Sequence, residues 1–199
     1  MTGTDGRAMM PGKGMPVLPM TPATIEGPRL ILRPWRQDDL EPLFAINGDP
    51  ESMRYFASVM TRAESDAWAA RLQAHFAEHG WGFWVVEERG GAPFVGVVGL
   101  MNIPWTARFT PAVEIGWRIA PAFRRRGHAE EAARMALGYG FGALRLPEIV
   151  AFTVPANAPS WRLMERLGMT PDGSFGHPRL PADHPLHEHV LYRLVASRG

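Results

Sequence analysis

Short stretches of apolar residues, some of them alternating with polar ones, mark the strands of this chain. They are rich in β-branched or aromatic residues and are bounded by Gly, Pro or charged residues, which is typical of strands. Two of them flank the sequence Arg-Gly-Gly-Ala at residues 89–92, which predicts a hairpin turn. The strands predicted in this way cover residues 29–33, 82–88, 93–101, 113–119, 148–154, 169–175 and 188–194.

Four other segments are predicted to be helices from their capping residues and apolar spacing. The first begins at Asp38, with Glu41 as the second member of a capping-box-like pair, and ends at a Gly-Asp-Pro run. The second begins with the capping box Thr61-x-x-Glu64 and ends at Gly80. The remaining two cover residues 128–141 and 157–168.

Residues 112–140 join a strand, a basic turn and a helix. The strand 113–119 is followed by Arg-Arg-Arg-Gly at 124–127, directly before the helix. The free N–H groups and positive dipole end of a helix suit a phosphate, and Gly127 lets a ligand approach the backbone. These features predict a phosphate-binding corner, although three arginines taken alone are more simply interpreted as a solvated helix entry.

The order of these elements predicts a mixed α/β (α+β) fold with a largely antiparallel, twisted sheet. Residues 1–22, rich in Gly, Pro, Thr and Met and without periodicity, are expected to form a disordered leader. Residues 23–199 are expected to form one domain, since a chain of 199 residues suits a single core.

Composition narrows the classes of function. The net charge of +1 gives no global field that would attract nucleic acid or an anionic membrane. No apolar run approaches the ~18 residues of a membrane span, and the N-terminus lacks the layout of a secretory signal. The chain has no cysteine, which excludes disulfides, an acyl-cysteine intermediate and Cys-based zinc sites. A cytoplasmic location is compatible with these features.

Two motifs and the opening of the chain carry a resemblance to a known family. Arg124-x-x-Gly127-x-Ala129 resembles the acetyl-CoA motif Arg/Gln-x-x-Gly-x-Gly/Ala of the GCN5-related N-acetyltransferases (GNAT). Residues 157–169 resemble the second motif of that family, Asn-x-x-Ser followed by a short helix ending in Leu-Gly-Phe/Met. The opening at residues 29–40 resembles the RimJ/RimL-type branch. The resemblance covers residues 25–194.

The resemblance implies the GNAT fold, in which two central strands splay apart to admit acetyl-CoA. It also implies transfer of an acetyl group to a primary amine, either a protein N-terminal α-amine or a small-molecule amine, by direct attack in a ternary complex. Acetyl-CoA is the expected co-substrate, no metal, nucleic acid or membrane partner is expected, and a homodimer is compatible with the family.

The same resemblance suggests roles for individual residues. Glu114, on the predicted strand, is the candidate general base; an exposed carboxylate paired with an Arg is the alternative. Many relatives carry a tyrosine acid where this chain has Met164, which leaves Ser160 or water as the proton donor. Asn157 is either a cofactor contact or a helix N-cap. The residues expected to bind the cofactor are Trp117, Arg118, Ile119, Arg124, Arg125, Arg126, Gly127, His128, Ala129, Asn157 and Ser160.

The free energy of deprotonating the acceptor favours a weakly basic amine. Neutralising an α-amino group of pKa ~8 at pH 7 costs about 1.4 kcal/mol, whereas a lysine of pKa ~10.4 costs nearly ~4.6 kcal/mol. A site with one candidate carboxylate and no tyrosine acid therefore suits an α-amine or another weakly basic amine better than a lysine.

The sequence also allows other functions and other sites. A non-catalytic CoA-binding module on the same fold is the main one, because the tyrosine is missing, and nucleic-acid binding through residues 124–126 is a weaker one. His184, His187 and His189 allow a zinc site, although a polar loop leading into the last strand is favoured. The aromatic residues considered as walls of an acceptor cleft are Trp35, Trp81, Trp84, Trp105 and Phe109.

Overall fold

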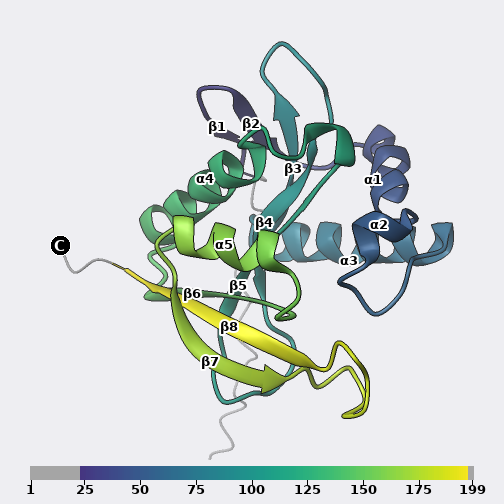
Figure 1. Ribbon diagram of the computed structural model, residues 1–199. Helices are drawn as coiled ribbons and strands as arrows, with labels where there is room; N and C mark the ends of the chain where they lie inside the picture. The colour runs from purple at the N-terminus through teal and green to yellow at the C-terminus, as the bar shows by residue number, and fades with distance from the viewer. Residues whose placement is uncertain (1–22, 197–199) are drawn as a thin grey trace, which may run out of the picture.

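An eight-stranded sheet runs through the molecule in the order β1-β2-β3-β4-β5-β6-β8-β7 (Figure 1). The computed structural model describes residues 23–196, so the leader expected at residues 1–22 lies outside the described residues. All neighbouring strands are antiparallel except β5 and β6, which are parallel. The strands are β1 Ile25–Glu26, β2 Leu30–Arg33, β3 Phe83–Glu88, β4 Gly96–Asn102, β5 Val113–Ile119, β6 Glu148–Thr153, β7 Thr170–Gly176 and β8 Glu188–Val195.

Helices cover both faces of this sheet, and the strand residues alternate between them. Along β3, Trp84 and Val86 belong to the core beneath α4, whereas Phe83 and Val85 pack with α1 and α3. None of the helices in residues 23–196 has the length and apolar character needed to cross a bilayer. The helices are α1 Leu40–Asn47, α2 Pro50–Met53, α3 Arg62–His79, α4 His128–Gly142 and α5 Ala158–Arg166, with 3-10 turns η1 Gln37–Asp39 and η2 Pro121–Phe123.

The start of α1 differs from the prediction. A 3-10 turn precedes the helix, and the backbone N–H of Arg36 donates to the carboxylate of Asp39 at 2.6 Å. Asp39 also accepts two bonds from the buried guanidinium of Arg33. The prediction that Asp38 and Glu41 form a capping pair is therefore wrong. Glu41 instead accepts a hydrogen bond from Arg62 on α3.

Besides the two 3-10 turns, β1 and α2 have no counterpart in the prediction. The Gly-Asp-Pro run does end α1 at its C-cap Gly48, but it also starts a further helix. Asp49 caps α2 by accepting from the Ser52 N–H at 2.8 Å, and Pro50 stands at the first position of that helix, where its missing N–H is harmless. This short helix matters because it forms part of the cavity described below.

The two parallel strands at the centre diverge. β4 and β5 pair along seven residues, from Gly96 with Ile119 to Asn102 with Val113. β5 and β6 pair only once, through Glu114 and Val150. Beyond Glu114, one side of β5 therefore has no strand partner among residues 23–196, and peptide groups on that side are available to a ligand. The predicted fold class, including the splayed central pair, is confirmed.

Candidate active site

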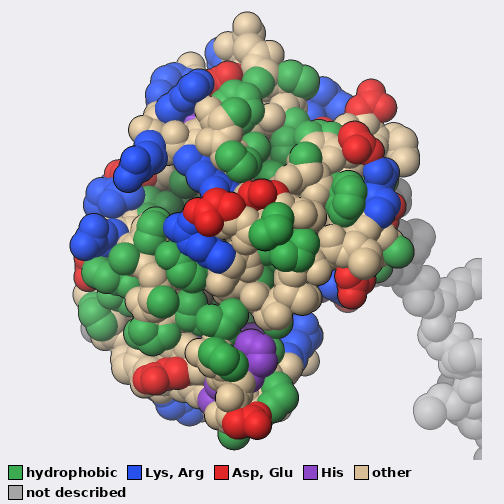
Figure 2. Space-filling model, turned by 45° about the vertical axis from the view of Figure 1, so that its right-hand side comes forward, with side chains coloured by type: hydrophobic (Ala, Val, Ile, Leu, Met, Phe, Trp, Pro, Cys, Tyr) green, Lys and Arg blue, Asp and Glu red, His purple; other side chains and the backbone are tan. Residues whose placement is uncertain are grey.

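A cavity of about 1070 Å³ lies beside the unpaired part of β5. Its walls come from residues 114–119 of β5, the first turn of α4, the end of β6, α5, and the region of α2 and α3. Figure 2 shows arginine side chains (blue) at the left and centre of one face of the molecule, interspersed with acidic side chains (red). The cavity brings residues far apart in the sequence into one site.

The first turn of α4 forms the corner predicted from the sequence. Gly127 is the N-cap residue and has a left-handed backbone with φ of 81°, which favours glycine. The first bond of the helix runs from the Glu131 N–H to the Gly127 carbonyl at 3.0 Å. Before it, the N–H groups of residues 126–130 have no hydrogen-bond partner within residues 23–196. Such a helix end suits an anionic group.

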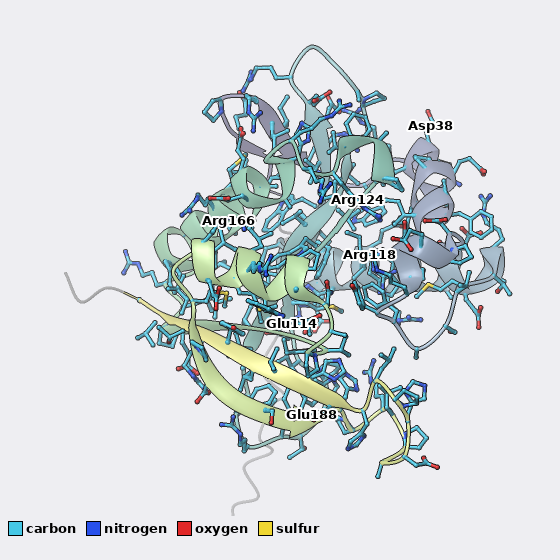
Figure 3. The ribbon with its side chains drawn as sticks, viewed as in Figure 1. Asp38, Glu114, Arg118, Arg124, Arg166 and Glu188 are labelled. Atoms are coloured by element: carbon cyan, nitrogen blue, oxygen red, sulfur yellow. The ribbon has the colours of Figure 1, made fainter. Side chains whose placement is uncertain are left out.

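The three arginines of the turn differ in their surroundings (Figure 3 labels Arg124). Arg124 is half-buried and donates to the Ile119 carbonyl at 3.1 Å and to the Ser52 hydroxyl at 2.6 Å. It therefore ties the turn to β5 and α2. Arg125 and Arg126 are exposed, and the guanidinium of Arg126 lies 5.9 Å from the Phe123 ring.

The His128 ring faces the interior of the protein. Its Nδ1 lies 2.9 Å from the Phe123 carbonyl, and its Nε2 lies 2.8 Å from a carboxylate oxygen of Glu88. The hydrogen bond from His128 holds the pKa of Glu88 below its usual range. Because the ring already has these partners, the prediction that His128 binds the cofactor depends on its backbone N–H.

Glu114 lies at the one bridge between β5 and β6 and borders the cavity. Burial raises the pKa of its carboxyl to about 7, an effect that the positive charge of Arg179 partly offsets. Within the described residues Glu114 has no salt bridge, so the alternative of an exposed carboxylate paired with an arginine is wrong. A carboxyl with this pKa exchanges a proton near neutral pH, as a general base must.

The second motif lines the opposite wall of the cavity. The Asn157 side chain donates to the Thr153 hydroxyl at 2.9 Å, and no side-chain capping bond forms at the start of α5. Asn157 therefore occupies the N-cap position without capping through its side chain. Ser160 and Met164 also line the cavity from α5.

The cavity end near α2 and α3 was not predicted. Arg118 was expected only as a cofactor contact, yet its guanidinium donates to the Asn47 amide oxygen at 2.5 Å and lies 4.2 Å from the Phe56 ring and 3.9 Å from the Trp68 ring. Burial lowers the pKa of Arg118 to about 9, so it stays charged at neutral pH. Strand alternation could have found this residue, because Arg118 shares a face of β5 with Glu114.

The aromatic residues considered as cleft walls lie elsewhere. Trp84 is fully buried between Phe76 and Tyr139, and Trp105 packs in an aromatic cluster with Phe109. Aromatic walls come instead from residues that the sequence did not single out. None of Trp35, Trp81, Trp84, Trp105 and Phe109 lines the cavity; Tyr55, Phe56, Trp68, Phe83 and Phe152 do.

The histidines near the end of the chain make local contacts. The His187 Nδ1 lies 3.1 Å from the Leu180 carbonyl, and the His184 Nδ1 accepts from the Leu186 N–H at 3.1 Å. His187 precedes β8, so only His189 lies on the strand. Within the described residues no three His, Asp or Glu side chains are grouped as a metal site would require.

Comparisons with known proteins agree with this geometry. The family model described as "Acetyltransferase (GNAT) domain" matches residues 29–170. The N-acetyltransferase YoaA of Bacillus subtilis, itself uncharacterized, is 31% identical over 153 residues, which cover 75% of this chain and 84% of YoaA. The chain therefore belongs to the GNAT acetyltransferase family, and it is an N-acetyltransferase.

Solved structures place the chain within the same family. A GNAT-family acetyltransferase from Bacillus anthracis superposes with a TM-score of 0.71 at 26% identity, covering 87% of this chain and 98% of that one. Mycobacterium smegmatis RimJ, solved in complex with CoA-disulfide, superposes with a TM-score of 0.69 at 26% identity, covering 89% of this chain and 90% of RimJ. The predicted GNAT family is confirmed, and a RimJ protein is among its structural neighbours.

Proposed function

We propose that this protein transfers the acetyl group of acetyl-CoA to a primary amine, by direct attack of the amine within a ternary complex. The amine is either a protein N-terminal α-amine or a small-molecule amine. The observation that carries the proposal is the position of Glu114. Its carboxyl has a pKa of about 7 and borders the same cavity as the N–H groups at the start of α4, which have no partner in the described part of the chain.

The α4 corner would hold the diphosphate of the co-substrate. Backbone N–H groups from Arg126 to Ala129 would donate to its oxygens, and the exposed side chains of Arg125 and Arg126 would add charge-assisted bonds. The acyl-bearing arm would lie along the unpaired side of β5, where an N–H between Trp117 and Ile119 would stabilise the oxyanion. Asn157 would contact this arm from the opposite wall.

Glu114 would take the proton of the attacking ammonium, directly or through a water. A base of pKa about 7 accepts a proton from an α-ammonium of pKa ~8 at a cost of about 1.4 kcal/mol, but from a lysine of pKa ~10.4 at about 4.6 kcal/mol. The site therefore suits an α-amine or another weakly basic amine. The thiolate, with a pKa near ~8.5, leaves without a strong acid, so Ser160 or water would suffice as its proton donor.

Acetyl-CoA binding and thiol release test the proposal separately. Saturating acetyl-CoA is expected to raise the melting temperature, because a ligand selective for the folded state stabilises it. A thiol-release screen over amines, amino acids and short peptides with free N-termini is expected to identify acceptors. The absence of any shift with acetyl-CoA and other acyl-CoAs would reject the proposal. Binding without thiol release across the panel would favour a non-catalytic CoA-binding module.

A further inference from the structure

Arg118 carries a positive charge in the cavity wall that the proposed reaction leaves unused (Figure 3). Its Nη1 donates to the Asn47 amide oxygen and lies 3.8 Å from the sulfur of Met53. Its Nε and Nη2 have no hydrogen-bond partner within residues 23–196. The contacts to Asn47 and Met53 direct the guanidinium toward α1 and α2.

The protein supplies no counter-ion for this charge in its described part. None of the salt bridges there includes Arg118. The carboxylates that line the cavity either pair with other arginines or lie far from Arg118. Glu51 pairs with Arg54, and Glu130 pairs with two arginines outside the corner. Glu114 is four residues away on the same strand, which separates the two Cα atoms by about 13 Å.

A partly buried cation without a carboxylate partner is unfavourable. The Phe56 and Trp68 rings contribute cation–π attraction but offer no hydrogen-bond acceptor. The free edge of the guanidinium therefore remains able to donate two parallel N–H bonds, the geometry that fits a carboxylate.

We infer that Arg118 binds a carboxylate of the acceptor, so that the acceptor is an amine that also carries a carboxylate several bonds from its nitrogen. This inference rests on the proposed function, because it takes the amine to react beside Glu114.

The cavity surface between Glu114 and Arg118 suits an acceptor whose amine and carboxylate are several bonds apart. Gly116 lies between Glu114 and Arg118 on the same face of β5, and a Cβ atom there would come within 2.8 Å of the Phe83 ring. The Phe83 ring therefore packs against Gly116 and gives the cavity an apolar surface between the two charged residues. An acceptor that spans these groups combines an amine at one end, an uncharged middle and a carboxylate at the other.

The test uses acceptor pairs that differ only in the carboxylate. Peptides of two to four residues with free N-termini, and ω-amino acids, are each prepared as the free acid and as the amide. Thiol release from acetyl-CoA then gives kcat/KM for each pair. The wild-type protein is expected to prefer the acid by about 10- to 100-fold at the matching length, as a charged hydrogen-bonded pair provides.

Two variants separate binding of the carboxylate from a structural role. Arg118→Gln is expected to abolish the preference for the acid while keeping the shift in melting temperature with acetyl-CoA. Arg118→Lys, which keeps the charge but not the planar fork, is expected to retain part of the preference. Arg54→Gln removes a cavity charge that already pairs with Glu51, and its preference should stay at the wild-type level.

The outcomes are distinct. Equal rates with acid and amide in the wild type, or a preference that persists in Arg118→Gln, would overturn the inference and leave the proposed function standing. An equal loss of preference in Arg54→Gln would also overturn the inference, because the preference would then come from the overall positive charge of the cavity and not from Arg118. If acetyl-CoA neither binds nor releases thiol with any amine, the proposed function fails and the inference fails with it.

Discussion

At the α4 end of the cavity, the groups that face a ligand come from one continuous stretch, residues 119–130. At the α2–α3 end they come from separate elements, with Asn47 on α1, Phe56 after α2, Trp68 on α3 and Arg118 on β5. At the α4 end, most of the groups available to a ligand are backbone N–H groups. At the α2–α3 end, most of them are side chains. A backbone site tolerates substitution of most of its side chains, whereas a site made of side chains changes with each substitution.

The same difference predicts how the two ends respond to substitution. A change at the α4 end should affect binding of acetyl-CoA whatever the acceptor, because the backbone N–H groups would bind a part of it that does not react. A change at the other end should alter the choice of acceptor. Glu114 lies at the far end of β5 from the α4 turn and should affect the rate with every acceptor.

The largest effect is expected from Gly127→Glu. The substitution places a side chain on a left-handed residue, at a cost of about 1–2 kcal/mol, and brings a negative charge to the predicted diphosphate site. Acetyl-CoA should then no longer raise the melting temperature. Gly138→Glu is the matched control, since Gly138 is exposed on the same helix with open space around it. An unchanged shift in Gly127→Glu would contradict the assignment of this end.

Glu114→Gln should lower kcat by about 10²- to 10⁴-fold, as the loss of a general base typically does. The pKa of Glu114 is raised from 4.5 to about 7, so the folded protein keeps a proton that the unfolded chain has already released between these pH values. The carboxyl therefore lowers stability progressively as pH rises through this interval. Glu114→Gln should be more stable than wild type above pH 7, by up to ~3 kcal/mol.

Steady-state rates and thermal melts at pH 8 measure both effects of this substitution. Glu188→Gln, at an exposed carboxylate where β8 begins, is the control and should change neither quantity. A wild-type kcat in Glu114→Gln would remove this residue from the mechanism.

The pH dependence of kcat gives a smaller effect and needs no substitution. The base acts only when deprotonated, so the rate should rise about tenfold per pH unit below about 7 and level off above it. Buffers from pH 5 to 8.5 with saturating acetyl-CoA and acceptor cover this range. The same profile measured on Glu114→Gln should lack the rise near 7, and its persistence would point to another titrating group.

The smallest effect is expected from Ser160→Ala. Because a thiolate of pKa ~8.5 leaves without a strong acid, kcat should fall by less than about tenfold. The Ser160 N–H bond to the Asn157 carbonyl, at 3.0 Å, does not involve the side chain and should persist. Single-turnover thiol release measures the change, with Ser174→Ala on the exposed strand β7 as the control. A far larger loss would give Ser160 a role beyond proton donation.

The sequence predicted what depends on residues close together in the chain. The strand, turn and helix around Gly127 form one local unit, and the period of two along β5 puts Glu114 and Arg118 on one face of the strand. The Thr61 capping box and the Gly80 end of α3 were also correct, because both are local backbone interactions.

The sequence did not predict what depends on contacts across the fold. Asp39 rather than Asp38 begins the α1 region because Arg33 pairs with it from another element. Trp84 lies in the core and Trp68 lines the cavity, because the packing of α3 on β3 decides which rings reach the cavity. The pKa of Glu114 likewise depends on its burial and on Arg179, which lies 65 positions away in the chain.

The single pair of residues that joins β5 to β6 has a mechanical consequence. Within the described residues it is the one backbone bridge between two parts of the sheet, β1 to β5 on one side and β6 to β8 on the other. A molecule bound in the gap would touch both parts and restrict their relative motion. Amide hydrogen exchange should then slow in β6 and β8, far from the diphosphate corner, as well as in β5.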